Sequence, residues 1–357
     1  MISTPFVAVP PRDYGGTELI VHELAEGLAA RGHEVILFAT GDSRTRGELR
    51  WLFERAQWPP DELADIDHVS WALAEARAAD VDLVHAHSAV ALGLVRLAPE
   101  LPLVYTIHHA RDERFSALYR NHPHANYVAI SADQGRREIP LPRATVIHHG
   151  LDPSRYDWAP RAEPYLAFVS RLAPEKGPDL AIDVAARAGL ELRVAGGVHP
   201  PDRDFATREL EHRLLQPHVR YLGVIGPEVK RPLLRGARAL LAPLRWHEPF
   251  GLILIEAMLS GCPVVAFRMG SAPELVEEGV TGFLVNTIEE MTAIVRPGGA
   301  LEGFDRGRCR RRAVERFASA RMVSDHERLY QRVLAEHSPH PHRHGRRGAG
   351  RAVMRVV

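Results

Sequence analysis

Two glutamates and the short turn beside them are the residues of this sequence best arranged for chemistry. In the segment Trp246–Gly261, WHEPFGLILIEAMLSG, Glu248 stands eight residues before Glu256. Pro249 disfavours a helical conformation in the residue before it, and the apolar run that follows predicts a helix over 252–259. Glu256 then lies on the helix, whereas Glu248 precedes it. Glu248 is next to backbone amides with no partner inside the helix, those of Phe250, Gly251 and Leu252.

This arrangement suits a sugar nucleotide. One carboxylate can accept hydrogen bonds from sugar hydroxyls, the amides can hold a phosphate, and the second carboxylate, two turns on, can bind a ribose diol. The alternative is a surface helix that carries two solvated acids. Another segment of the chain favours the sugar nucleotide.

A cationic turn follows an apolar strand earlier in the chain. The run at 165–170 (YLAFVS) predicts a buried strand, and 178–188 predicts a helix. Between them lie Arg171, a planar fork of donors, and Lys176, a point charge, at the carboxyl end of a strand, where open α/β sheets bind ligands. The chain has only two lysines, Lys176 and Lys230, so a lysine in this turn is not background. The pair is a candidate phosphate site, and the alternative is two solvated loop charges.

Short motifs along nearly the whole chain occur in the order typical of one enzyme family. They are YGGTE (14–18), VHAHS (84–88), YTIHH (105–109), VAIS (128–131), VIHHGLDPSRY (146–156), SRLAPEKG (170–177) and HEPFGLILIEAM (247–258). In this ordered set the chain resembles the retaining glycosyltransferases of family 4, the glycosyl transferases group 1. The resemblance implies an α/β GT-B fold, in which two Rossmann-like parallel-sheet domains face each other across a ligand-binding cleft. It also implies that a C-terminal helix packs back on the N-terminal domain.

The same resemblance implies roles for individual residues. Arg171 and Lys176 would bind the donor diphosphate, Glu248 would contact the donor sugar, and Glu256 would bind the ribose. His108 would lie near the reacting carbon. The expected catalytic residues are therefore His108, Arg171, Lys176 and Glu248. The expected donor-binding residues are Gly15, Gly16, Arg171, Lys176, Val224, Glu248, Pro249, Phe250, Gly251, Leu252 and Glu256.

The implied reaction moves a sugar from a nucleoside diphosphate sugar to an acceptor hydroxyl, with retention at the anomeric carbon. Departure of the diphosphate builds negative charge, which Arg171, Lys176 and the turn amides would stabilise. Family chemistry implies front-face attack, with the leaving phosphate oxygen helping to take the acceptor proton. No cofactor and no obligatory metal are expected, because the cationic side chains replace the ion. The acceptor is expected to be a sugar, a glycan, a lipid-linked molecule or a small molecule.

Three rival functions share this pattern. A nucleotide-sugar epimerase or hydrolase has the same fold and donor site. A phosphorylase with pyridoxal phosphate needs a lysine for its Schiff base, which leaves only Lys230 once Lys176 is assigned. A noncatalytic sugar-nucleotide-binding protein would bind the donor without turnover. The base, the sugar and the acceptor stay open.

Length, charge and cysteine content limit the classes of partner and the cellular compartment that we expect. The 357 residues suffice for two domains, and the formal net charge of zero gives no sign of a nucleic-acid binder. Two cysteines are too few for a disulfide framework, and no run reaches the length of a membrane span, so we expect a cytoplasmic enzyme. Peripheral membrane contact has no support in the charges of the first helix.

Twenty histidines suggest metal binding, but no metal site is expected. His85 and His87 share one face of a predicted strand, and no third ligand is set by the spacing. His108 differs because it ends a strand and carries the family match. The alternative is that it only shapes the pocket.

The apolar strands and amphipathic helices alternate in two series. We expect strands at 34–40, 83–86, 103–107, 127–130 and 145–147, then at 165–170, 192–195, 219–222, 239–243, 264–267 and 282–285. This predicts an N-terminal acceptor domain (1–155), a donor domain (156–318), a crossover helix (319–336) and a disordered His/Arg-rich tail (337–357). Compared with the family, residues 1–4 look like only the final third of the first strand. Either the chain tolerates a short strand, or the natural start lies upstream. A missing central strand would leave a gap in the hydrogen bonding of the first sheet.

Overall fold

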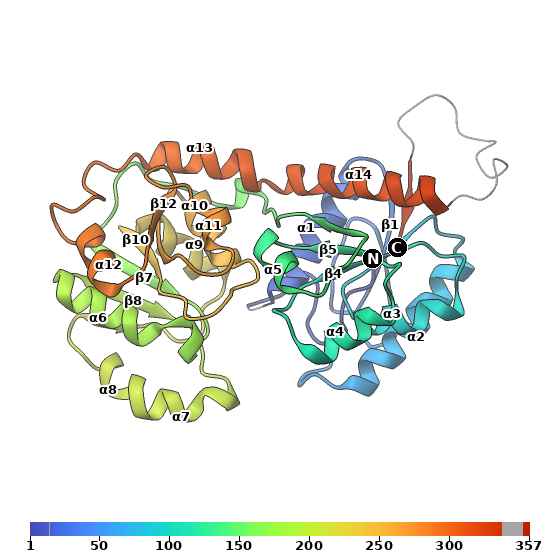
Figure 1. The fold of residues 1–357 in the computed structure, drawn as a ribbon, viewed down its shortest axis with the longest axis horizontal. Helices are drawn as coiled ribbons and strands as arrows, with labels where there is room; N and C mark the ends of the chain where they lie inside the picture. The colour runs from blue at the N-terminus through green and yellow to red at the C-terminus, as the bar shows by residue number, and fades with distance from the viewer. Residues whose placement is uncertain (14, 338–352) are drawn as a thin grey trace. The chain divides into compact units, whose positions relative to one another are not determined.

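The computed structural model describes residues 1–13, 15–337 and 353–357, and it divides the chain into two α/β units (Figure 1). Unit 1 consists of Met1–Gly150 and Ser319–Val357, and unit 2 of Leu151–Ala318. Within the described residues, no helix is both long and apolar enough to span a bilayer.

Unit 2 contains one sheet of six parallel strands in the order β12-β11-β10-β7-β8-β9. The strands are β7 (Tyr165–Val169), β8 (Glu191–Ala195), β9 (Val219–Tyr221), β10 (Ala239–Ala242), β11 (Val264–Phe267) and β12 (Gly282–Val285). The helices are α6 (Pro178–Ala188), α7 (Arg203–Phe205), α8 (Glu211–Leu214), α9 (Pro227–Gly236), α10 (Leu252–Leu259), α11 (Ala272–Leu275), α12 (Ile288–Val295) and α13 (Arg306–Phe317). All six expected strands are confirmed to within one residue at each end.

The strand order of unit 2 reverses direction between β7 and β10. From β7 the chain adds β8 and β9 on one side, and it then returns to add β10, β11 and β12 on the other. Both faces are covered, so strands such as β7 and β10 are buried almost throughout and appear in the sequence as unbroken apolar runs. The loops that leave β7 and β10 therefore meet at the point where parallel α/β sheets bind ligands.

Unit 1 contains two groups of parallel strands, β13-β1-β2 and β3-β4-β5-β6. The strands are β1 (Glu34–Ala39), β2 (Glu48–Trp51), β3 (Val84–Ala86), β4 (Leu103–Ile107), β5 (Asn126–Ala129), β6 (Ala144–Val146) and β13 (Arg355–Val356). The helices are α1 (Gly16–Ala30), α2 (Glu62–Ala78), α3 (Val90–Leu94), α4 (Glu113–Arg120), α5 (Ala132–Arg137) and α14 (Ser319–His337). The five expected strands are confirmed. The sequence did not indicate β2, because this edge strand is largely exposed and lacks an apolar run.

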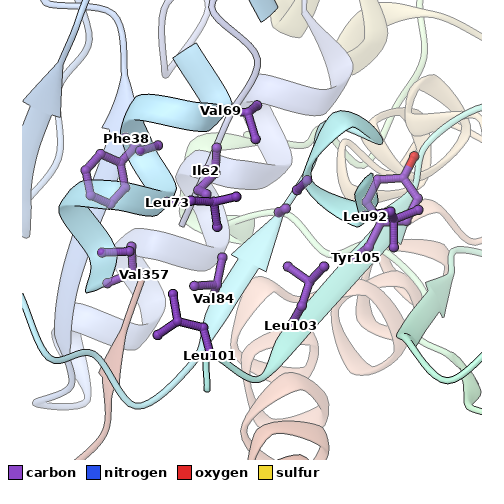
Figure 2. Packing of buried hydrophobic residues seen from close by; sticks show 14 of the residues in the cluster. Ile2, Phe38, Val69, Leu73, Val84, Leu92, Leu101, Leu103, Tyr105 and Val357 are labelled. Carbon is purple, nitrogen blue, oxygen red and sulfur yellow. The ribbon is translucent and has the colours of Figure 1, made fainter. Parts of the chain in front are cut away.

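The gap expected in the first sheet is filled from both ends of the chain. Ile2 bridges Phe38 of β1 and Ala86 of β3, and Val356 pairs with Val35 and bridges Leu83. Figure 1 shows the two chain ends side by side in unit 1. Figure 2 shows Ile2 and Val357 in one apolar cluster with Phe38 and Val84.

The prediction of a disordered tail over 337–357 is therefore wrong at its two ends. His337 is the last residue of α14, and the segment 353–357 is ordered and partly in β13. The composition of the whole tail obscured its final VMRVV, an apolar and partly β-branched run that suits a buried strand. The stretch between them, 338–352, lies outside the described residues.

Helix α14 belongs to unit 1 and packs against α1, as the expected C-terminal helix should. The Arg31 guanidinium donates to the Glu327 carboxylate at 2.5 Å, and His33 Nε2 lies 2.9 Å from the same carboxylate. A Cβ atom on Gly27 of α1 would lie 2.4 Å from Val323 Cγ2 of α14. Glycine at this position therefore allows the two helices to approach closely.

Candidate active site

The turn after β7 is held in shape by its own backbone and by the next loop. Lys176 N donates to Ala173 O at 3.0 Å, and Gly177 ends the turn with φ +71° before Pro178 starts α6. A Cβ on Gly177 would lie 2.3 Å from Pro243 O, so only glycine lets this turn approach the end of β10. Arg245 N completes the junction by donating to Glu175 O at 2.8 Å.

The two cations of this turn already have anionic partners. The Arg171 guanidinium pairs with Glu175 and lies 3.3 Å from the Asp202 carboxylate. Lys176 Nζ pairs with the Glu248 carboxylate and lies 4.5 Å from the centroid of the Trp246 ring. The structure therefore brings Lys176 and Glu248 into direct contact, although 72 residues separate them.

Glu248 is fixed by the turn that carries it. Trp246 Nε1 donates to Glu248 Oε2 at 3.1 Å, and Ser271 N donates to Glu248 O at 3.0 Å. Gly270, with φ +59°, packs so closely that a Cβ there would lie 2.4 Å from Glu248 N. Because these contacts hold the turn on both faces, the Glu248 carboxylate has a defined position near the carboxyl ends of the strands.

The rest of the turn reaches the start of α10 as the sequence predicted. Gly251 has φ +81° and caps the helix, so its amide and that of Leu252 stand at the positive end of α10. Pro249 is buried, and the Phe250 side chain is 2% exposed. Ser271 Oγ donates to Phe250 O at 2.6 Å. Pro249 and Phe250 can therefore contribute backbone atoms to a ligand, while the Phe250 ring belongs to the core.

Glu256 lies on α10 with a buried carboxylate that has two partners. Lys230 Nζ of α9 is 2.7 Å from Glu256 Oε1, and Tyr156 Oη donates to the same oxygen at 3.1 Å. Only 5% of the Glu256 side chain is exposed. A buried carboxylate held by an ammonium and a phenol keeps a fixed orientation.

Val224 marks an exposed apolar surface beyond β9. Its side chain is 66% exposed, and its Cγ2 lies 2.9 Å from where a Cβ on Gly197 would be. Gly196 follows β8 with φ +145°, and a Cβ there would lie 1.7 Å from Ser170 O. Glycine at 196 thus allows the loop after β8 to pack against the end of β7, and glycine at 197 allows the same loop to contact Val224, which follows β9.

Gly15 and Gly16 begin α1 in unit 1. Gly15 is the N-cap of the helix, and a Cβ there would meet Pro11 Cβ at 2.8 Å and Glu18 Oε2 at 2.9 Å. Burial raises the pKa of the Glu18 carboxyl, although a hydrogen bond from Thr4 opposes the shift. The glycine loop is therefore a crowded turn over a buried acid.

His108 follows β4 in unit 1 and contacts two other histidines. Its Nε2 lies 2.8 Å from His87 Nδ1, and its ring stacks on His149 with centroids 5.5 Å apart. Burial lowers the pKa of His108 to about 3 and that of His326, on α14 nearby, to about 4. At neutral pH the His108 ring is consequently uncharged, with Nε2 within hydrogen-bond distance of His87 Nδ1.

Sequence reasoning missed four residues that the structure places beside the expected ones. They are Tyr156, Lys230, Trp246 and His87. Lys230 had one available signal, since it is the second of only two lysines. Tyr156 and His87 had no local signal, because their contacts with Glu256 and His108 join separate elements of the fold. Trp246 lies two residues from Glu248, but its contact with Lys176 also forms only in the folded chain. Among the described residues, no group of three or more His, Cys, Asp or Glu side chains is arranged to hold a metal ion.

Comparisons with known proteins identify the family of the chain. Residues 157–296 match the family model described as Glycosyl transferases group 1, and residues 14–155 match the one described as Glycosyltransferase Family 4. Glycogen synthase of Mycobacterium tuberculosis (strain CDC 1551 / Oshkosh) is 30% identical over 332 residues, which is 76% of this chain and 79% of that protein.

Two solved structures have a similar fold. AviGT4, a glycosyltransferase involved in avilamycin A biosynthesis, matches with a TM-score of 0.70 and 26% identity over 94% of this chain and 98% of the other. Anabaena HepE in complex with UDP-glucose matches with a TM-score of 0.71 and 22% identity over 94% and 99%. Two parallel-sheet units, the ordered motifs and these matches lead to one conclusion: the chain belongs to the glycosyltransferases of family 4 and has their GT-B fold.

Proposed function

We propose that this glycosyltransferase transfers a hexose from a nucleoside diphosphate sugar to an acceptor hydroxyl and retains the anomeric configuration. The observation that carries the proposal is the contact between Lys176 and Glu248 at the switch point of the unit 2 sheet. One loop brings a cation for phosphate and the other brings a carboxylate for sugar hydroxyls. A donor in which a diphosphate is joined directly to a sugar suits this pair of side chains.

The diphosphate would take over cations that are now paired within the protein. Lys176 and Arg171 are each neutralised by carboxylates, and 15% and 26% of their side chains are exposed. A diphosphate can displace Glu248 from Lys176 and free that carboxylate to accept hydrogen bonds from the sugar. The amides of Gly251 and Leu252 add donors at the positive end of α10. The exchange of partners couples donor binding to the arrangement of Glu248.

The nucleoside would bind on the other side of the same strand ends. Glu256 is held in place by Lys230 and Tyr156, so its carboxylate is preorganised to accept hydrogen bonds from a ribose diol. The exposed Val224 offers an apolar surface for a base, next to backbone groups that can read its edge.

The transfer step would rely on electrostatics. As the leaving diphosphate gains charge, Arg171 and Lys176 stabilise it, and one such preorganised donor typically contributes about 3 kcal/mol. The neutral ring of His108 is proposed to hydrogen-bond a hydroxyl rather than to supply a charge. We also propose that no metal is needed, so the transfer rate with EDTA should equal the rate without it.

The test is donor binding followed by product analysis. UDP-, GDP- and ADP-sugars, UDP-glucose among them, are compared by thermal shift, because a ligand at one hundred times its Kd adds about 2.7 kcal/mol of stability. Proton NMR of the product then reports the anomeric configuration. An inverted product would overturn the retaining mechanism, and absence of a shift with every donor would overturn the donor site.

Two rival activities are separated by the same samples. An epimerase or hydrolase would convert or release the sugar with no acceptor present. A noncatalytic binding protein would give thermal shifts with no turnover at all. Chemical acetylation of the two lysines, followed by mass spectrometry, shows where the donor binds. A donor that binds at the proposed site should slow the acetylation of Lys176.

A further inference from the structure

The sheet of unit 1 is continuous only through a strand that is made of two pieces. The segment 353–357 lies between the first half of β1 and residues 82–85, and Met1–Ser3 lies between the second half of β1 and residues 85–87. Both pieces run parallel to their neighbours. Without them, the strands β1 and β2 would be separated from β3, β4, β5 and β6.

The backbone of 353–357 is hydrogen-bonded on both edges. On one edge, Glu34 N donates to Met354 O at 3.0 Å. On the other edge, Asp82 N donates to Arg355 O at 3.0 Å, Val357 N to Leu83 O at 2.8 Å, and His85 N to Val357 O at 2.5 Å. Arg355 N also donates to the Asp82 carboxylate at 2.7 Å. Backbone bonds on both edges are typical of a central strand.

The side chains of the segment are part of the core. Met354 is 4% exposed, and Val356 and Val357 are fully buried, whereas Val353 is 39% exposed. Figure 2 shows Val357 beside Leu101, Val84 and Phe38 in the same cluster as Ile2. Burying three apolar side chains of this size is a substantial part of the stability of one domain.

The register of the two pieces is that of one uninterrupted strand. Arg355 stands opposite Glu34, and Ile2 stands opposite Phe38, four positions further along β1. Ile2 is also four positions beyond Arg355 when Val357 is followed directly by Met1. The Met1 amine is fully buried, donates to Ile36 O at 2.5 Å, and has a pKa lowered by desolvation. A peptide bond between Val357 and Met1 would therefore fit the register of the sheet and replace the buried amine by an amide.

We propose that the slot between β1 and β3 is a strand-binding site, and that the chain's own segment Val353–Val357 is its occupant. The slot accepts a parallel, apolar strand of five residues that meets the amine of Met1. The fold is thus completed by strand complementation, a function separate from sugar transfer. Since His85 N is bonded to Val357 O, and His87 follows on the same edge, the occupant also holds the chain that places His87 against His108.

Two substitutions in the full chain test the buried contact. Val356→Asp puts a charge into the core strand and should lower the melting temperature of unit 1 by roughly 10 °C or more. Val353→Asp changes the exposed residue of the same segment and should shift it by less than about 2 °C. Equal melting temperatures for the two variants would overturn the proposal.

A shortened chain tests whether the segment 353–357 can bind as a separate strand, and a permuted chain tests whether its register continues into Met1. Removing residues 353–357 should lower the melting temperature. The free peptide VMRVV at millimolar concentration should restore about half of the loss. The peptide with Val356→Asp should restore none of it. A permuted chain, in which VMRVV is placed directly before Met1 without a linker and deleted from its present position, should melt at or above the temperature of the original. If the shortened chain fails to fold, the permuted chain and the Val356→Asp variant still decide.

Three outcomes would overturn the proposal. The permuted chain could melt as low as the shortened one, the wild-type peptide could bind no better than its Val356→Asp form, or the segment could come from a second copy. The last case would give a dimer in light scattering and a melting temperature that rises with protein concentration.

Discussion

Lys230 forms an ion pair with Glu256 inside unit 2, with Nζ 2.7 Å from Oε1. The other lysine of the chain, Lys176, pairs with Glu248. Each of the two lysines is therefore matched to one of the two glutamates of the WHEPFGLILIEAMLSG segment. The pairs differ in exposure, since 14% of the Glu248 side chain is accessible but only 5% of Glu256. This difference predicts that the first pair can exchange partners with a ligand, whereas the second is a fixed support.

Replacing Lys230 with methionine should destabilise unit 2 by about 3–5 kcal/mol, because it leaves the Glu256 carboxylate buried without its cationic partner. Urea unfolding followed by circular dichroism measures the change. The double variant Lys230→Met with Glu256→Gln removes both charges and should recover most of the loss. A Lys230→Met protein that unfolds at the same urea concentration as the wild type would show that the pair contributes nothing.

Lys176→Ala and Arg171→Ala should each lower kcat by at least roughly tenfold, with the fold retained, since each removes a cation from the leaving diphosphate. Steady-state kinetics with the donor found by thermal shift measure the effect. Arg208→Ala is the matched control, because Arg208 pairs with Asp204 on the surface and both side chains are at least 75% exposed. Unchanged turnover in either site variant would remove that residue from the mechanism.

Gly270→Ala should weaken donor binding and turnover by about tenfold or more, because its Cβ would lie 2.4 Å from Glu248 N and must displace the turn that carries the carboxylate. Gly279→Ala separates this effect from backbone strain. Gly279 has a similar positive φ of +70°, but a Cβ there meets nothing within 4 Å. The kinetic constants and melting temperatures of the two variants are compared. Equal losses of activity would mean that strain alone, and not contact with Glu248, explains the result.

Unit 1 should lose stability as the pH falls from about 6.5 to about 4. Burial lowers the pKa of His68 to about 4, that of His108 to about 3 and that of His326 to about 4. The unfolded chain, with histidine pKa values near 6.5, binds more protons in this range, so each group removes roughly 1.4 kcal/mol per pH unit. Above pH 6.5 these histidines are neutral in both states and should have no effect.

Urea unfolding at a series of pH values measures this slope. The His68→Phe variant should reduce the slope by about one proton. A stability of unit 1 that is constant between pH 6.5 and 4.5 would contradict the prediction.

The elements of the fold could be predicted where the signal is local. Strands such as β7, β10 and β11 are short apolar runs bounded by proline, serine or arginine, and this pattern reflects burial on both faces of a parallel sheet. The turns after β7 and before α10 could also be predicted, because proline and glycine restrict or permit particular backbone angles within a few residues. The candidate phosphate and sugar groups followed, since Arg171, Lys176 and Glu248 lie in those turns.

The sequence by itself thus determined the two alternating series of elements, the family and the residues at the ends of β7 and β10. Only the tertiary structure decided which charges pair and how the first sheet closes. Tyr156 reaches Glu256 across 100 residues, and Val356 pairs with Val35 from the opposite end of the chain. Such contacts leave no local pattern, because their free energy comes from burying groups that are adjacent only after folding. The final VMRVV became a central strand for this reason, since the gap in the sheet that it fills exists only in three dimensions.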